Sequence, residues 1–241
     1  MGKHDLDTLS RAARTPLDEL TKGLRAILEE KLASVIVYGS AARGDYKEGR
    51  SDLDVMIILS DVSRDVLDRI ANTLAVAHTS GRIDTMLVTE EEILRAADVF
   101  PLFYEDIQKC HAVLFGSDPF EGLEISSSHR RLRIEQELRE AQIRLRRSVT
   151  DGRGDERALG VAVSRKLRQV RFPLRALLEI LGVECQSYSL DIVLQKACKK
   201  FVVDGADLLR PEKKPQASHA ALTKLLANAI DVVDHLEEVK G

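Results

Sequence analysis

Two short stretches near the start of the chain decide its fold and carry its chemistry. Residues 35–44 read VIVYGSAARG, and residues 51–55 read SDLDV. The β-branched run before Gly39 is typical of a buried strand, and glycine at its end lets the backbone approach a ligand closely. Ser40 offers a hydroxyl and an N–H at the start of a helix-compatible segment, where phosphate binding is favoured. We therefore expect a strand, a turn and a helix start that bind phosphate.

Acidic residues follow on the next two predicted strands. Asp52 and Asp54 are two residues apart, so alternation is expected to place both carboxylates on one face of the second strand. Crowded carboxylates repel each other unless cations neutralise them, and hard oxygen ligands suit Mg²⁺. Asp84 lies on a third apolar strand, where an unpaired charge is costly. If these strands are neighbours, three carboxylates meet and two metal ions become possible.

This combination of Gly-Ser, Asp-x-Asp and a later strand aspartate resembles the signature of the polymerase-β-like nucleotidyltransferase superfamily. The form GSAARG followed by SDLD is most similar to its small prokaryotic members. These include aminoglycoside nucleotidyltransferases and minimal nucleotidyltransferases paired with helical toxin-like proteins. The resemblance covers about residues 30–118.

The resemblance implies a role for each site residue. Asp52 and Asp54 would bind two Mg²⁺ ions, and Asp84 would complete the second metal site or help to deprotonate the acceptor hydroxyl. All three would be both catalytic and metal-binding residues.

Three further residues are expected to bind the nucleotide. By the same resemblance, Gly39 and Ser40 would hold the β- and γ-phosphates of ATP or another nucleoside triphosphate, and Arg43 would assist them. The competing interpretation for Arg43 is an arginine on a helix surface, or one paired with Asp45.

The order of elements predicts fold class α+β. Residues 1–120 are expected to form a nucleotidyltransferase domain, a small mixed β-sheet flanked by helices. Residues 125–241 are expected to form an all-α helical bundle, similar in outline to the helical domain that accompanies many such enzymes. Its predicted helices cover residues 129–150, 156–182, 188–201 and 217–239. Pro173 is expected to kink or split the second of these helices.

Composition excludes several other classes of protein. Apolar residues make up 44% and charged residues 31%, which is typical of a soluble globular chain. No apolar run approaches the roughly 20 residues that span a bilayer. The three scattered cysteines indicate free thiols in a reducing cytoplasm rather than a disulfide framework or a zinc site. With 4% aromatic residues and no Trp, platforms for stacking single-stranded nucleic acid are not expected.

Charge is distributed unevenly along the chain. Residues 1–128 carry 14 basic and 23 acidic side chains, whereas residues 129–175 carry 14 basic and 6 acidic ones. Arg168, Arg171 and Arg175 share one helical face. That face is first interpreted as solvated or as an interface with the acidic first domain. Contact with a triphosphate or a nucleic acid is the alternative.

The function predicted from these observations is metal-dependent transfer of a nucleoside monophosphate, AMP from ATP, to a hydroxyl of a small molecule, with release of pyrophosphate. Two alternatives stay open: a nucleotidyltransferase that modifies and silences a partner toxin, and a nucleotide-binding regulatory protein without catalysis. The expected partners are the nucleoside triphosphate and a small-molecule or protein acceptor. Nucleic acid is disfavoured, no membrane is expected, and a homodimer is left open.

Overall fold

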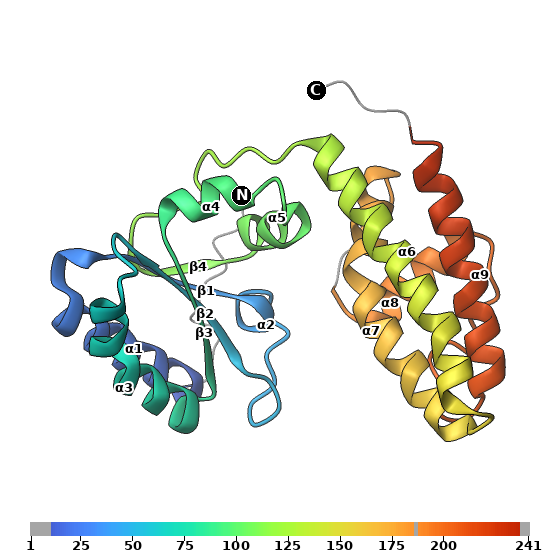
Figure 1. The fold of residues 1–241 in the computed structure, drawn as a ribbon, viewed down its shortest axis with the longest axis horizontal. Coiled ribbons are helices and arrows are strands. Elements are labelled where there is room, and N and C mark those ends of the chain that lie inside the picture. Colours follow the sequence, from blue (N-terminus) through green and yellow to red (C-terminus); the bar gives the residue numbers. More distant parts are fainter. Residues whose placement is uncertain (1–10, 186–187, 237–241) are drawn as a thin grey trace. The chain divides into compact units, whose positions relative to one another are not determined.

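The computed structural model describes residues 11–185 and 188–236. The chain divides into two compact units, Met1–Ile125 and Ser126–Gly241, each drawn as a ribbon in Figure 1. Within the described ranges, no helix combines the length and the apolar character needed to cross a membrane.

The first unit is built on one four-stranded sheet with helices on both faces. Its strands are β1 (Leu32–Tyr38), β2 (Leu53–Leu59), β3 (Ile83–Val88) and β4 (Ala112–Gly116). Its helices are α1 (Arg11–Leu28), the 3₁₀ turn η2 (Glu29–Lys31), α2 (Gly39–Ala42), α3 (Arg64–Gly81), α4 (Glu90–Ala96) and α5 (Pro101–Lys109).

The sheet is mixed, with strand order β3-β2-β1-β4. Strand β1 runs antiparallel to both β2 and β4, whereas β2 and β3 run parallel. Parallel neighbours need a crossover connection, which α3 supplies between β2 and β3. Because β2 and β3 run parallel and β1 runs against them, the end of β1 and the starts of β2 and β3 lie at the same edge.

Alternation along β2 separates two cores and fixes the side on which the chemistry lies. Val55 and Ile57 point into a core closed by α1 and α3, whereas Met56 and Ile58 point into a second core closed by α4 and α5. Figure 1 shows the two helix pairs on opposite faces of the sheet. Asp54 has the parity of Met56, so its side chain belongs to the α4/α5 face.

The second unit is entirely helical in the residues that the structure describes. It contains α6 (Ser127–Gly152), α7 (Glu156–Ile180), α8 (Leu190–Lys200) and α9 (Pro215–Asp234). Helices α6, α7 and α9 pack against one another, and α8 packs against α7. Buried leucines on three helices, Leu138, Leu174 and Leu225, contribute to its interior.

The predicted fold class is therefore confirmed: a mixed sheet flanked by helices precedes a helical region. Pro173 does not split its helix, because α7 continues through it from Glu156 to Ile180. Thr89 and Glu92 form a capping box at the start of α4, in which the side chain of each accepts a hydrogen bond from the backbone N–H of the other.

The segment that follows β4, residues 117–125, is held against the first unit over most of its length. Phe120 is buried, and Gln108 donates hydrogen bonds to the carbonyls of Phe120 and Leu123. The His111 ring lies 2.9 Å from the Asp118 carboxylate. Residues 117–123 are thereby tied to α5 and the sheet.

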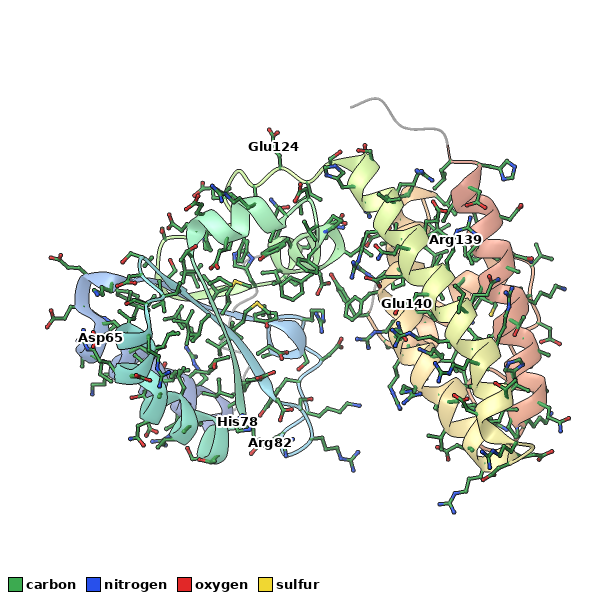
Figure 2. All side chains as sticks on the ribbon, viewed as in Figure 1. Asp65, His78, Arg82, Glu124, Arg139 and Glu140 are labelled. Carbon is green, nitrogen blue, oxygen red and sulfur yellow. The ribbon has the colours of Figure 1, made fainter. Side chains whose placement is uncertain are left out.

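Limited proteolysis should therefore cut within residues 124–126, between the anchored segment and α6, near Glu124 in Figure 2, and release two stable fragments. Mass spectrometry of the early fragments would locate the cut. We propose on this basis that the two units are separate domains. First cuts within residues 117–123, or inside a helix of either unit, would contradict that boundary.

Candidate active site

Three side chains form a row across neighbouring strands at one edge of the sheet. Tyr38 on β1 pairs with Asp54 on β2, and Asp54 pairs in parallel register with Asp84 on β3. Side chains of directly paired residues share one face and lie close together. The structure thus brings Asp54 and Asp84 together, as expected, and adds Tyr38 beside them.

Gly39 lets the turn after β1 lie directly against Asp54. Its φ of +69° is left-handed, and an added Cβ would lie 1.9 Å from Oδ2 of Asp54. Only glycine relieves both constraints at this position. The Ser40 backbone N–H donates a hydrogen bond to the Asp54 carboxylate. The Gly39–Ser40 turn therefore positions a carboxylate in addition to the phosphate-binding role predicted for it.

The groups around Asp54 shift its pKa in opposite directions. Burial raises the pKa of Asp54, the Arg43 guanidinium lowers it, and the Asp84 and Asp52 carboxylates raise it again. The hydrogen bond from Ser40 also lowers it, and the pKa of Asp54 ends above its ordinary value. A carboxylate with carboxylate neighbours and little solvent is stabilised by a bound cation.

Sequence reasoning missed Tyr38, which it treated only as the end of a strand. Burial raises the pKa of Tyr38 to about 12, and the Asp54 and Asp84 carboxylates contribute to the shift. The ring packs edge-on against Phe103 of α5, with ring centroids 5.8 Å apart. Strand alternation could have indicated this residue, because Tyr38 is two residues from Ile36 and therefore lies on the same α4/α5 face, next to Gly39.

Asp52 lies apart from this row in the described structure. It precedes β2, which begins at Leu53. Its Oδ1 accepts a hydrogen bond from Nε of Arg82 at 3.0 Å and lies 2.8 Å from Nη2 of the same ion pair. Arg82 ends α3 in a left-handed conformation, at the place labelled in Figure 2. Both side chains are about half exposed, so this ion pair is weak enough to exchange for another ligand.

Arg43 is engaged by α5. Its Nη1 lies 2.7 Å from Oδ2 of Asp106, and both side chains are nearly buried, with 9% and 14% of their surfaces exposed. Neither a helix-surface arginine nor a pair with Asp45 describes this arrangement. This ion pair joins the turn after β1 to α5. The positive charge of Arg43 lowers the pKa of Asp54. Binding of nucleotide by Arg43 stays a prediction.

Of the three arginines singled out in the second unit, Arg171 and Arg175 contact residues of that unit, whereas Arg168 is exposed. Arg175 pairs with Glu179 at 2.7 Å and lies over the Tyr188 ring, while Arg171 lies over the Phe172 ring. With 12% of its side-chain surface exposed, Arg175 does not belong to a solvated face. The interface with the first domain and the contact with a triphosphate or a nucleic acid stay predictions.

The acidic edge of the sheet fits a divalent cation chemically. Asp54 and Asp84 supply two carboxylates in register, and carboxylates with substrate phosphates are the ligands that Mg²⁺ prefers. No group of three His, Cys, Asp or Glu side chains spaced to hold a metal occurs among residues 11–185 and 188–236. The expected third carboxylate, Asp52, would have to leave Arg82 to join the pair.

Comparison with known proteins shows to which family the first unit belongs. The family model "Nucleotidyltransferase domain" matches residues 17–133. The matched residues include all four strands of the first unit, so this sheet belongs to a nucleotidyltransferase domain. The family predicted from the sequence is thereby confirmed, and with it the class of enzyme to which this domain belongs.

Two similar proteins add detail to the nucleotidyltransferase domain. A "Putative protein adenylyltransferase" of Methanocaldococcus jannaschii is 46% identical over 46 residues, which are 19% of this chain and 46% of that protein. The crystal structure of spectinomycin adenyltransferase AAD(9) from Enterococcus faecialis, determined with ATP and spectinomycin, is similar with a TM-score of 0.52. At 12% identity it covers 92% of this chain and 98% of that one, a likeness of fold.

Proposed function

We propose that this protein transfers AMP from ATP to a hydroxyl group of a small-molecule acceptor, with Mg²⁺ bound at the acidic edge of the sheet and pyrophosphate released. The observation that carries the proposal is the register of Asp54 with Asp84 beside the Gly39–Ser40 turn. Within a nucleotidyltransferase domain, this is the place where carboxylates and a close-approaching backbone meet.

Each residue of the site then has a task. Asp54 and Asp84 would hold Mg²⁺, with Asp52 as a third ligand if it leaves Arg82, and the ion would supply positive charge to the triphosphate. The Ser40 hydroxyl, at the end of the turn that lies against Asp54, would donate a hydrogen bond to a phosphate oxygen. Asp84, the more exposed of the paired carboxylates, accepts the proton of the attacking hydroxyl. Positioning and charge neutralisation supply most of the rate enhancement in such a reaction.

The acceptor is proposed from the extent of the structural likeness. The adenyltransferase that resembles this chain over 92% of its length carries spectinomycin in its structure, and the likeness extends through the helical unit. A protein acceptor is the second candidate, favoured by the 46% identity over 46 residues with the "Putative protein adenylyltransferase". ATP is the common donor that both names imply.

The donor and metal are tested by thermal unfolding. Mg²⁺ with ATP should raise the melting temperature by several degrees, since ligand at about 100 times its dissociation constant stabilises by about 2.7 kcal/mol. ATP with EDTA should do much less, because the unneutralised carboxylates repel the triphosphate. GTP, CTP and UTP serve as donor controls. Equal shifts with and without Mg²⁺ would contradict the metal-dependent site.

The acceptor is tested by a screen that follows the transfer of radiolabelled AMP from ATP to candidate acceptors. Radiolabelled ATP and Mg²⁺ are supplied with a panel of aminoglycosides and aminocyclitols in one arm, and with cell lysate proteins in the other. Label that appears on a small molecule supports the proposal. Label that appears only on protein would transfer the function to the second candidate.

A further inference from the structure

The Tyr38 hydroxyl has no part in holding the fold. Its ring is fixed by the edge-on contact with Phe103 and by the second core, in which Tyr38 packs. Across residues 11–185 and 188–236, no hydrogen bond joins the hydroxyl to another group of the protein. A tyrosine with a packed ring and a hydroxyl free for other partners is well placed to bind a ligand.

The order of Tyr38, Asp54 and Asp84 across the sheet indicates which part of the nucleotide the Tyr38 hydroxyl would contact. Tyr38 lies on β1, Asp54 on β2 and Asp84 on β3, so Tyr38 and Asp84 flank Asp54 on opposite sides. The chain continues from Tyr38 directly into the Gly39–Ser40 turn. With the acceptor hydroxyl assigned to the Asp84 side, Tyr38 lies on the side of the phosphates.

Chemistry agrees with this position. A tyrosine hydroxyl is protonated at neutral pH and can donate a hydrogen bond. An anionic phosphate oxygen is a stronger acceptor than a neutral one, so a hydrogen bond to it is worth more than an ordinary one. Phenylalanine would keep the packing against Phe103 and remove only the donor.

We propose that the Tyr38 hydroxyl donates a hydrogen bond to the β- or γ-phosphate of the bound nucleotide, which makes Tyr38 a substrate-binding residue. This inference rests on the proposed function and deepens it, because it assigns a nucleotide contact that neither the Gly-Ser turn nor the aspartates supply.

The test compares Tyr38→Phe with wild type by isothermal titration with ATP and with AMP, both in the presence of Mg²⁺. ATP affinity should fall about tenfold to a hundredfold, the effect of removing one hydrogen bond to a charged group. AMP affinity should not change, because AMP lacks the phosphates concerned. Tyr104→Phe is the matched control: Tyr104 is a buried tyrosine of α5 that also stacks edge-on with Phe103 but lies outside the row.

The outcomes are distinct. Unchanged ATP affinity in Tyr38→Phe would overturn the proposal, and so would equal losses for ATP and AMP, which would indicate a general disturbance of the site. A matching loss in Tyr104→Phe would overturn it as well, by assigning the effect to packing. A wild-type chain that binds no nucleotide would instead overturn the proposed function, a result that the wild-type titration shows by itself.

Discussion

Asp54→Asn should abolish nucleotidyl transfer and leave the fold at least as stable as that of the wild type. Asp54 is the carboxylate that contacts the Gly39–Ser40 turn and stands in register with Asp84. Losing a metal ligand removes several kcal/mol of transition-state stabilisation, and about 4 kcal/mol corresponds to roughly a thousandfold in rate. Pyrophosphate release with the acceptor found in the screen measures the effect.

The stability of the metal-free Asp54→Asn variant should not fall with its activity. Burial, Asp84 and Asp52 disfavour the charged form of Asp54, so a neutral side chain of the same shape relieves repulsion in the metal-free protein. The melting temperature of metal-free Asp54→Asn should therefore equal or exceed that of the wild type, while the shift caused by Mg²⁺ and ATP should largely vanish.

Asp65→Asn is the control for Asp54→Asn. Asp65 is an exposed aspartate in the first turn of α3, labelled in Figure 2, and its replacement makes the same chemical change away from the row. Its activity should be close to that of the wild type. An Asp54→Asn variant with undiminished turnover would remove the acidic edge from consideration as the active site.

Gly39→Ala should reduce transfer by at least a hundredfold and destabilise the protein, for two separable reasons. A left-handed φ of +69° costs a residue with a Cβ about 1–2 kcal/mol. The added methyl would also overlap Oδ2 of Asp54 at 1.9 Å and the carboxyl carbon at 2.8 Å, so the carboxylate must move. A displacement of about 1 Å in a catalytic group can cost a hundredfold in rate.

Gly49→Ala separates the two costs. Gly49 has a φ of +73°, and a Cβ added there would meet no heavy atom of the described residues within 4 Å. It should lose a similar amount of stability through backbone strain but retain turnover. Chemical denaturation gives the free energy of unfolding of both variants, and pyrophosphate release gives their activity. If Gly39→Ala turns over normally, the contact between this turn and Asp54 is dispensable.

The sequence by itself determined the elements and the family. Short apolar runs bounded by glycine and polar residues specify strands such as β1, which ends at Tyr38 directly before Gly39. Capping residues such as Thr89 mark helix starts. The motif around Gly39 and Asp54 gave the family because its residue types and spacing are local features. Local patterns are readable from the chain because neighbours in sequence stay neighbours in space.

Tertiary structure decided how the candidate site is arranged. Whether Asp84 meets Asp54 depends on the parallel register of β2 and β3, which no local pattern specifies because it is set by packing of whole strands. The partners of Arg43 and Asp52 lie 63 and 30 residues away along the chain, at Asp106 and Arg82. Charge alone allows many such pairs, and only the folded chain selects one, because a buried charge must meet the partner that packing brings to it.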